Sequence, residues 1–332
     1  MIARLFCYMT AMAMMMLALP ARAEDGYDLW LRYAPADQAR AADISAHARA
    51  IASRTNSPTL RAASQELQHA ITRMTGTAPA LAATPSAGAL WLATPDTAPA
   101  LPVSLKALGP EGYAIRSIDQ GGQPVTLIAA NSDIGVLHGV FHWLRLAQTG
   151  APLDRLDIRS APRIGLLNHW DNLNGTVERG YAGMSIWDWW RLPDYKGPRY
   201  TDYARANASI GINGTVLNNV NAKADSLTAP YIAKAAALAD IFRPYGIRVY
   251  LSVKWTAPME LDGLKTADPL DPQVAAWWKA KADEIYRAIP DFGGFLVKAN
   301  SEGQPGPQDY DPTIIYIYQL FLILHLPHQC FR

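Results

Sequence analysis

The first half of the chain has hydrophobic and polar patterns that predict a small α/β domain between residues 24 and 150. Apolar residues at helical spacing predict helices over residues 36–53 and 59–75, and Gly76 ends the second helix. Asp133 is expected to cap a further helix that runs through Leu146. Short apolar runs predict three strands, at residues 89–93, 113–118 and 125–130.

Residues 152–163 are expected to form a linker, and beyond them the pattern becomes a repeat of buried strand, polar residues and helix. This repeat is typical of consecutive βα units of a parallel (β/α)8 TIM barrel, of which about the first half is visible. A doubly wound open sheet has similar periodicity, but no glycine-rich phosphate loop follows these strands. The predicted strands are residues 164–167, 215–217, 247–253 and 295–297, and the predicted helices are residues 230–242 and 272–289.

The first 23 residues have the pattern of a secretory signal peptide. An apolar stretch follows Arg4, and Ala21-Arg22-Ala23 forms an Ala-x-Ala cleavage site. Because the stretch is too short for a membrane anchor, we expect an exported protein, periplasmic or secreted, that is cleaved after Ala23. A buried N-terminal helix is the alternative. One of the two cysteines leaves with the signal, so no internal disulfide is expected.

The last segment, residues 311–332, is apolar without helical or strand alternation. Gln319 and His325 interrupt it, and it is too short to span a bilayer comfortably. We expect an aberrant tail that comes from a frameshift or a truncated gene model. A genuine buried C-terminal strand or helix is the alternative.

Charge and composition narrow the range of partners. The 30 Lys and Arg residues nearly balance the 29 Asp and Glu residues, so there is no basic field for a polyphosphate and nucleic acid is not expected as a partner. The ten Trp and fifteen Tyr residues suit stacking on sugar faces, although aromatic cores use the same residues. His138 and His142 have the spacing of metal ligands, but no further ligand joins them, so neither a metal nor a cofactor is expected.

The most informative polar cluster follows the predicted strand at residues 295–297. Lys298 and Glu302 lie where this strand meets solvent, which is the edge that holds the active site in a β/α barrel. Glycines and prolines within residues 303–307 frame Glu302 in a rigid loop, as a positioned general acid requires. On spacing alone, a surface glutamate after a strand explains the pattern equally well.

Three long motifs resemble the α-glucuronidases of glycoside hydrolase family 67. They are LLNHWDNLNGTVERGYAGMSIWDWW at residues 166–190, GINGTVLNNVNA at residues 211–222 and KANSEGQPGPQDY at residues 298–310. The opening GYDLWLRY at residues 26–33 is similar to that family's mature start, so the resemblance covers residues 24–310. It implies an N-terminal α/β domain, a central (β/α)8 barrel, and removal of 4-O-methyl-glucuronic acid from xylo-oligosaccharides with inversion. The implied partners are glucuronoxylan-derived oligosaccharides, and the full-length form is a candidate homodimer.

The resemblance also implies roles for single residues. It places the general acid at Glu302, and at Lys298 a cation that contacts the uronic sugar. Trp170 and Val220 match positions that line the pocket for the sugar and its methyl group, and Glu178 falls among the acidic pocket residues. For Trp170, a core ring beneath the barrel mouth is the alternative.

The chemistry of inversion agrees with part of this set. An inverting glycosidase needs a protonated carboxyl group beside the glycosidic oxygen and a carboxylate about 6.5–9.5 Å away that activates water. Glu302 fits the first role, whereas the family's water-activating carboxylates come from later barrel strands, beyond the point at Asp311 where this sequence diverges. A cation at Lys298 suits an acidic substrate because it neutralises the carboxylate.

The sequence thus predicts an α/β protein with a small N-terminal α/β domain followed by the first half of a TIM barrel. Its parts are a signal peptide (1–23), the N-terminal domain (24–150), the barrel part (151–310) and the tail (311–332). We expect an inverting α-glucuronidase by descent, whose present chain is an inactive fragment with no membrane span after signal cleavage. A hexosaminidase-like glycosidase is one alternative, although its Asp-Glu acid pair would be Asp283-Glu284, inside a predicted helix. A non-catalytic sugar-binding remnant is the other.

Overall fold

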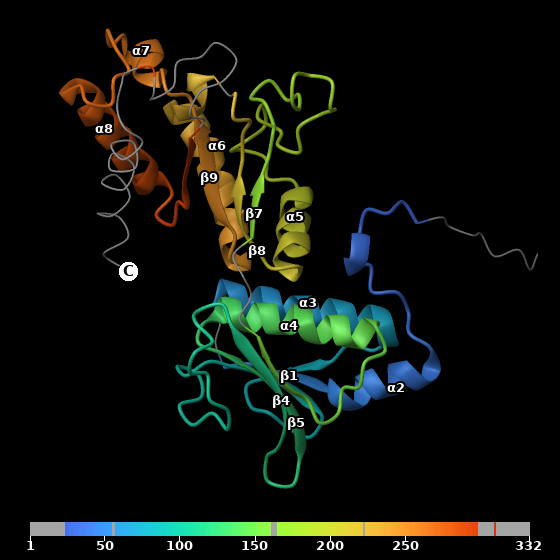
Figure 1. The fold of residues 1–332 in the computed structure, drawn as a ribbon. Coiled ribbons are helices and arrows are strands. Elements are labelled where there is room, and N and C mark those ends of the chain that lie inside the picture. Colours follow the sequence, from blue (N-terminus) through green and yellow to red (C-terminus); the bar gives the residue numbers. More distant parts are fainter. Residues whose placement is uncertain (1–23, 55–56, 161–164, 222, 298–308, 310–332) are drawn as a thin grey trace, which may run out of the picture. The chain divides into compact units, whose positions relative to one another are not determined.

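Figure 1 shows the computed structural model, which describes residues 24–54, 57–160, 165–221, 223–297 and 309. The chain divides into two compact units, Met1–Arg32 and Tyr33–Arg332. In the first unit, the short helix η1 (Leu29–Leu31) precedes Arg32, which pairs with Glu24. Among all the residues that the structure describes, no helix is long and apolar enough to cross a bilayer. The predicted signal peptide and the predicted tail lie outside the described residues.

The N-terminal part of the second unit is built on a six-stranded sheet in the order β2-β1-β3-β5-β4-β6. β4 runs antiparallel to both of its neighbours, whereas β2, β1, β3 and β5 pair in parallel. The strands are β1 (Ala50–Ala52), β2 (Ala80–Ala82), β3 (Ala89–Ala93), β4 (Tyr113–Asp119), β5 (Pro124–Ala130) and β6 (Asp157–Ser160).

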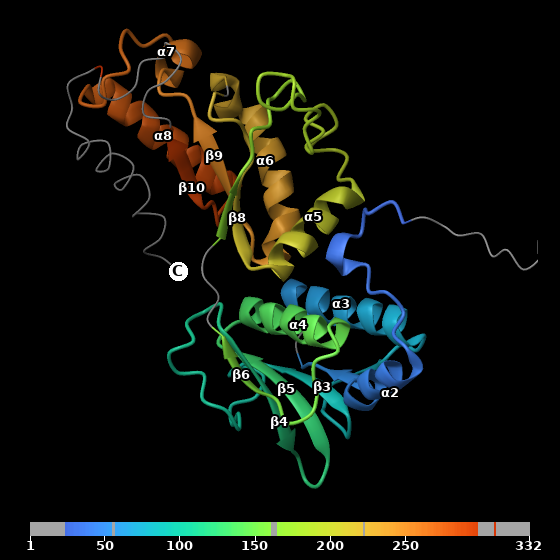
Figure 2. The same cartoon turned by 45° about the vertical axis from the view of Figure 1, so that its right-hand side comes forward.

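Helices α3 (Pro58–Thr75) and α4 (Asp133–Gln148) lie side by side over one face of this sheet, as both views show (Figures 1 and 2). Helix α2 (Gln38–His47) packs against α3. Gly139 lets α4 approach the sheet closely, because a Cβ atom there would lie 2.6 Å from Ile128 Cγ2. The helix layer therefore depends on this position for its close fit to β5.

The sequence predicts α3 correctly, including its end. Ser57 caps the helix by accepting a hydrogen bond from the Leu60 N–H at 3.1 Å, which is typically worth about 1 kcal/mol. Gly76 ends it in the left-handed conformation at φ 76°. The three predicted strands also form, as β3, β4 and β5.

Three predictions in this part are wrong. The predicted helix over residues 36–53 ends at His47, and Ala50–Ala52 form β1 instead. Pairing of β1 with β2 and with β3 overrides the helical preference of alanine. The predicted linker contains β6, which pairs with β4. Ser132, rather than Asp133, caps α4, since its hydroxyl accepts from the Gly135 N–H at 3.3 Å.

The C-terminal part of the second unit contains a parallel four-stranded sheet in the order β10-β9-β8-β7. Strands that follow one another in the chain are neighbours in the sheet, as in consecutive units of a barrel. The α/β fold class and the four predicted strands are therefore confirmed. β8 begins at Ile212. The prediction started it at Thr215, because Asn213 and Gly214 interrupt the apolar pattern. The strands are β7 (Gly165–Asn168), β8 (Ile212–Val216), β9 (Arg248–Val253) and β10 (Gly294–Val297).

Helices follow these strands and supply one hydrophobic core. Trp278 of α8 and Phe242 of α6 are fully buried in the same cluster as Leu251 of β9. Both predicted helices form, and the shorter helices α5 and α7 were not predicted. The helices are α5 (Pro198–Ser209), α6 (Ala229–Phe242), α7 (Ala257–Asp262) and α8 (Pro272–Ala288).

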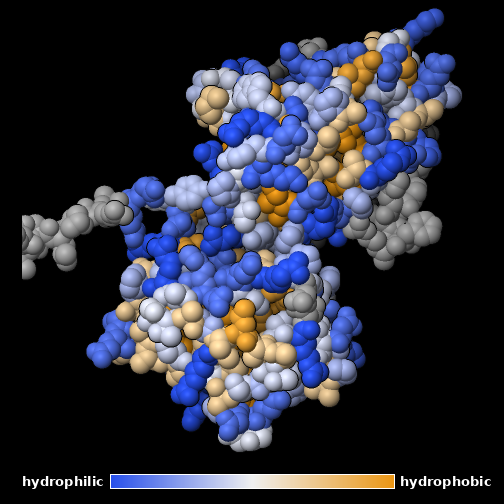
Figure 3. Space-filling model, turned by 180° about the vertical axis from the view of Figure 1, so that it is seen from behind, coloured by the Kyte–Doolittle hydropathy of each residue, from blue (hydrophilic) through white to orange (hydrophobic). Residues whose placement is uncertain are grey.

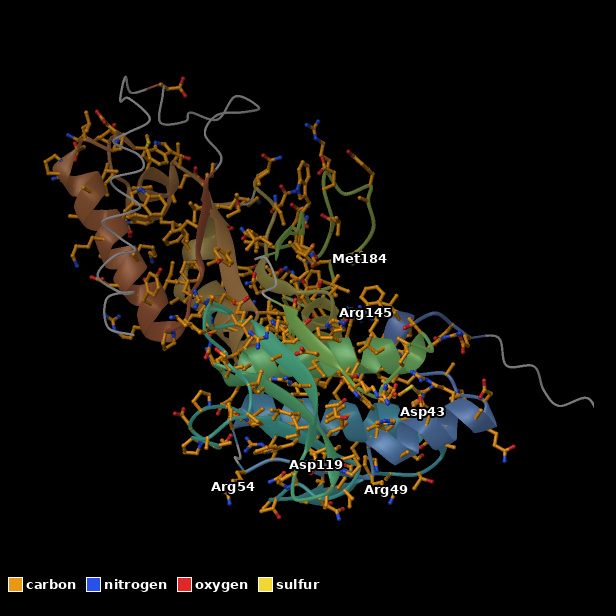
Figure 4. All side chains as sticks on the ribbon, turned by 60° about the horizontal axis from the view of Figure 1, so that its bottom comes forward. Asp43, Arg49, Arg54, Asp119, Arg145 and Met184 are labelled. Carbon is orange, nitrogen blue, oxygen red and sulfur yellow. The ribbon has the colours of Figure 1, made fainter. Side chains whose placement is uncertain are left out.

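Polar contacts connect the helix layer on the six-stranded sheet with α5. Glu66 of α3, only 5% exposed, accepts from Arg205 Nε at 2.7 Å and Nη2 at 3.0 Å, and from Tyr33 Oη at 2.6 Å. Burial, and then the charge and hydrogen bond of Glu66, raise the pKa of Tyr33 far above its usual value. Arg145 of α4, labelled in Figure 4, donates to the Ser209 carbonyl at 2.7 Å. These contacts link α5 to α3 and to α4.

Candidate active site at the ends of the parallel strands

Polar residues follow β7, β8 and β9 at the C-terminal edge of the parallel sheet. β7 continues into His169-Trp170-Asp171, β8 into Asn218-Asn219-Val220, and β9 into Lys254. In β/α barrels this edge collects the catalytic residues, because every strand delivers its next residue there. The predicted residues Trp170 and Val220 therefore lie on neighbouring strand ends.

Hydrogen bonds hold the backbone of Trp170, and its side chain is exposed. Asp171 is buried and accepts from Ser185 Oγ and from the Ile186 N–H at 3.0 Å. The Trp170 carbonyl accepts from the Glu178 N–H at 2.9 Å. Trp170 is 42% exposed, which argues against the alternative of a core ring beneath the barrel mouth. A fixed backbone with an exposed indole is the arrangement that stacking on a sugar requires.

His169 starts a chain of hydrogen bonds that reaches β8. Its Nδ1 lies 3.3 Å from Asp171 Oδ2 and its Nε2 lies 2.7 Å from Tyr203 Oη, which lies 2.9 Å from Thr215 Oγ1. Because a carboxylate only accepts, Nδ1–H donates to Asp171, and in the neutral imidazole Nε2 then accepts from Tyr203. Burial, opposed by the hydrogen bond from Thr215 and reinforced by the charge of Asp171, raises the pKa of Tyr203 to about 12. Tyr203 therefore stays protonated and can donate to His169 Nε2.

Two asparagine side chains join the loop after β7 to the loop after β8. Asn219 Nδ2 donates to Asn172 Oδ1 at 3.1 Å, and Asn172 Nδ2 donates to the Glu178 carbonyl at 2.7 Å. The Asn219 N–H also donates to the Asp171 carbonyl at 2.8 Å. These bonds bring together the segments that carry the three predicted pocket residues within the described part of the chain.

Glu178 has an unusual backbone for a glutamate, with φ 59° in the left-handed region. Its Oε1 accepts from Tyr181 Oη at 3.4 Å and lies 3.6 Å from Arg179 Nε. A non-glycine residue in this region is a reason to look for a functional constraint. The constraint here is a pair of hydrogen bonds: the Glu178 N–H donates to the Trp170 carbonyl, and the Glu178 carbonyl accepts from Asn172 Nδ2.

Lys254 directly follows β9 and is a cation that was not predicted as a site residue. Its Nζ lies 2.7 Å from Glu260 Oε1, and Thr256 Oγ1 donates to the same oxygen at 2.5 Å. Burial alone would raise the pKa of Glu260, but these two hydrogen bonds and the charge of Lys254 lower it below its usual value. A lysine directly after an apolar strand was the signal that could have identified this pair.

The structure describes only part of the predicted site. Trp170, Glu178 and Val220 lie on segments that hydrogen bonds bring together, whereas Lys298 and Glu302 lie outside the described residues. The strand predicted to precede Lys298 forms, since β10 ends at Val297.

Two observations concern residues outside the predicted pocket. Asn172 and Asn219 were not predicted, although runs of polar residues directly after two strands pointed to them. Within the described ranges, no three His, Cys, Asp or Glu side chains gather as metal ligands. His142, which the sequence considered as a ligand, has its Nδ1 2.8 Å from Tyr113 Oη.

Family models and curated relatives match most of the chain. Residues 29–143 match the glycosyl hydrolase family 67 N-terminus, and residues 146–316 match the glycosyl hydrolase family 67 middle domain. The alpha-glucuronidase A of Emericella nidulans is 36% identical in an alignment of 345 positions, gaps included, that covers 98% of this chain and 39% of that protein. The probable alpha-glucuronidase A of Aspergillus clavatus is 38% identical over 318 residues, which cover 93% of this chain and 37% of that protein. The chain thus spans less than two fifths of the length of these relatives.

Solved structures share the fold at low sequence identity. A family GH115 4-O-methyl-alpha-glucuronidase with specificity for decorated arabinogalactans has a TM-score of 0.51 and 14% identity, over 84% of this chain and 39% of that one. The N-acetyl-beta-hexosaminidase of Streptomyces plicatus has a TM-score of 0.51 and 13% identity, over 90% of this chain and 66% of that one. At these identities the likeness shows a shared arrangement of elements and nothing about substrate.

Proposed function

Because the chain belongs to glycosyl hydrolase family 67, we propose that it carries the substrate pocket of an inverting α-glucuronidase that removes 4-O-methyl-glucuronic acid from xylo-oligosaccharides. The observation that supports the proposal most is the hydrogen-bonded strand edge that carries Trp170, Glu178 and Val220 on neighbouring segments. An exposed indole, a small apolar side chain and a carboxylate together suit a methylated sugar with free hydroxyl groups.

Each residue has one role in this proposal. Glu302 protonates the glycosidic oxygen as the bond breaks, and Lys298 pairs with the carboxylate of the uronic acid. Trp170 stacks on a sugar face, and Val220 contacts the 4-O-methyl group. Glu178 supplies an acceptor for a sugar hydroxyl group.

The carboxylate that activates water is not assigned to the described residues. Asp171 is buried and held by Ser185 and Ile186, and Glu260 is held by Lys254 and Thr256. A general base needs a carboxylate oxygen turned toward an attacking water, which these engaged groups do not offer. We therefore propose neither Asp171 nor Glu260 as the general base.

The structure does not support Asp283 and Glu284 as the acid pair of the hexosaminidase-like alternative. Asp283 and Glu284 lie on α8, where they pair with Lys279 at 2.8 Å and Lys281 at 2.6 Å along the same helix. These are helix-surface ion pairs rather than acids at a strand end. The fold that this chain shares with a hexosaminidase does not supply the missing pair.

Kinetics of a chimera test the proposed reaction. The chain, joined at Tyr310 to the remainder of the Emericella nidulans relative, should release 4-O-methyl-glucuronic acid from aldouronic oligosaccharides. Glu302→Ala should lose activity on these natural substrates far more than on an aryl glucuronide whose acidic leaving group needs no proton. Glu284→Ala on α8 is the control and should change neither rate. Equal losses on both substrates in Glu302→Ala would assign Glu302 a structural role instead.

A further inference from the structure

The amide groups of Asn172 and Asn219 lie between the segments that carry the predicted pocket residues. Asn219 is 1% exposed, and its Nδ2 lies 3.1 Å from Asn172 Oδ1 and 3.3 Å from the Glu178 carbonyl. Its Oδ1 accepts from the Asn221 N–H at 2.9 Å. Asn172 Nδ2 donates to the same Glu178 carbonyl at 2.7 Å and to Thr176 Oγ1 at 2.9 Å. One pair of side chains therefore contacts all three segments.

Backbone partners determine the orientation of both amide groups. The Asn221 N–H can only donate, so oxygen is the atom of Asn219 that faces it. The Glu178 carbonyl can only accept, so nitrogen is the atom of Asn172 that faces it. An aspartate at either position would lose the donor, and an apolar residue would lose both groups. The contacts thus require an amide at each position.

Glu178 is the residue that most needs this support. Its backbone is left-handed at φ 59°, its N–H donates to the Trp170 carbonyl, and its own carbonyl accepts from both amides. A strained backbone of this kind persists only where its surroundings determine it. The two asparagines are the side chains that determine it here.

We propose that Asn172 and Asn219 are positioning residues that hold Trp170, Glu178 and Val220 as one rigid wall of the pocket and so set its selectivity for a methylated uronic acid. The rigid wall follows from the hydrogen bonds alone, whereas the ligand rests on the proposed function. Neither asparagine has to touch the sugar, because each acts through the residues that it holds.

Amide-resolved hydrogen exchange tests the rigid wall without any ligand. Asn219→Ala should speed exchange of the Glu178 and Asn221 amides by at least about tenfold, because both lose their support. Asn219→Asp keeps the acceptor for Asn221 and loses the donors, so it should release Glu178 while Asn221 stays protected. If Asn219→Ala does not fold, Asn172→Ala replaces it and should release Glu178.

Asn131→Ala is the matched control, since Asn131 Nδ2 donates to the Leu105 and Gly109 carbonyls at 3.1 and 2.9 Å, in the N-terminal part. It should leave the exchange of both reporter amides, Glu178 and Asn221, unchanged. Unchanged exchange in Asn219→Ala, or equally fast exchange in Asn131→Ala, would overturn the proposal.

Titration with 4-O-methyl-glucuronic acid and with glucuronic acid tests selectivity in the same proteins. Asn219→Ala should bind the methylated sugar at least about tenfold more weakly and lose the preference for it, whereas Asn131→Ala should bind as the wild type does. If exchange accelerates but affinity and preference stay, the positioning role is overturned. If the wild type binds neither sugar while exchange behaves as expected, the rigid wall stands, and the proposed function and its selectivity fail.

Discussion

Glu178 shows at the residue scale how this strand edge constrains its own backbone. The left-handed conformation at φ 59° brings its side chain to Tyr181 and Arg179 and its carbonyl to Asn172. No pattern in the sequence marks this conformation, because glutamate has no local preference for it. The surrounding hydrogen bonds, which join residues far apart in the chain, impose it.

Glycine at position 178 should therefore stabilise the protein relative to alanine. We expect Glu178→Gly to exceed Glu178→Ala in free energy of unfolding by about 1 kcal/mol, because glycine adopts positive φ without strain. At Glu284, inside α8, the order should reverse by about 1 kcal/mol, since glycine weakens a helix interior. Urea denaturation of the four variants measures both differences. The same order at both positions would contradict the assigned backbone.

The Lys254–Glu260 pair should make stability depend on acid pH. The pKa of Glu260 is lower in the folded protein than its ordinary value of 4.5, so its carboxylate stabilises the fold above that value, and this contribution is lost as the pH falls through the folded pKa. The unfolding free energies of wild type and Glu260→Gln should therefore differ at neutral pH and converge below about pH 4.5. Lys254→Met should weaken this convergence, because the cation that lowers the pKa is gone. A difference that is constant with pH would be inconsistent with the pairing.

At the scale of elements, the sequence predicts an element best when the start signal and the apolar spacing lie within that element. The helices α3, α6 and α8 have proline or a capping side chain at the start and apolar residues at helical spacing, and all three form as predicted. β1 and β6 were missed because only their pairing partners make them strands. Ala50–Ala52 prefers a helix locally, and residues 157–160 are too polar to resemble a buried strand.

The contact between α3 and α5 should depend on a buried ion pair. Arg205→Met leaves Glu66 buried without its cation, which typically costs about 3–5 kcal/mol. Lys279→Met is the control, because Lys279 pairs with Asp283 at 2.8 Å on the exposed side of α8, and such pairs contribute about 0–1 kcal/mol. Denaturant unfolding measures both. Equal losses would show that Glu66 is solvated or paired elsewhere.

At the scale of the whole molecule, the strand order of the parallel sheet was predictable, and the hydrogen bonds between the segments that follow its strands were not. The resemblance to family 67 singled out Trp170 and Val220, and each follows a recognisable strand. Asn172 and Asn219 act through contacts across strands that a linear pattern does not encode. The face in Figure 3 is mainly hydrophilic with smaller hydrophobic areas. The net charge of +1 supplies little long-range attraction for an anion, so the proposed recognition of an acidic sugar relies on a local cation.

Export should leave a defined N-terminus. We propose cleavage after Ala23, because a charged start, an apolar stretch and an Ala-x-Ala site precede it. Intact-mass measurement of the protein from an exporting host should give a chain that begins at Glu24. A mature protein that begins at Met1 would exclude a cleaved signal peptide.

Calorimetric titration with 4-O-methyl-glucuronic acid and with the neutral 4-O-methylglucose tests most directly whether the strand edge is a uronic acid pocket. We predict that the protein binds the acid at least about tenfold more tightly, since a charge-assisted hydrogen bond contributes about 1.5–3 kcal/mol. Lys298→Met should abolish this preference, and Trp170→Ala should weaken binding of both sugars alike. Equal affinity of the wild type for the two sugars would contradict the account.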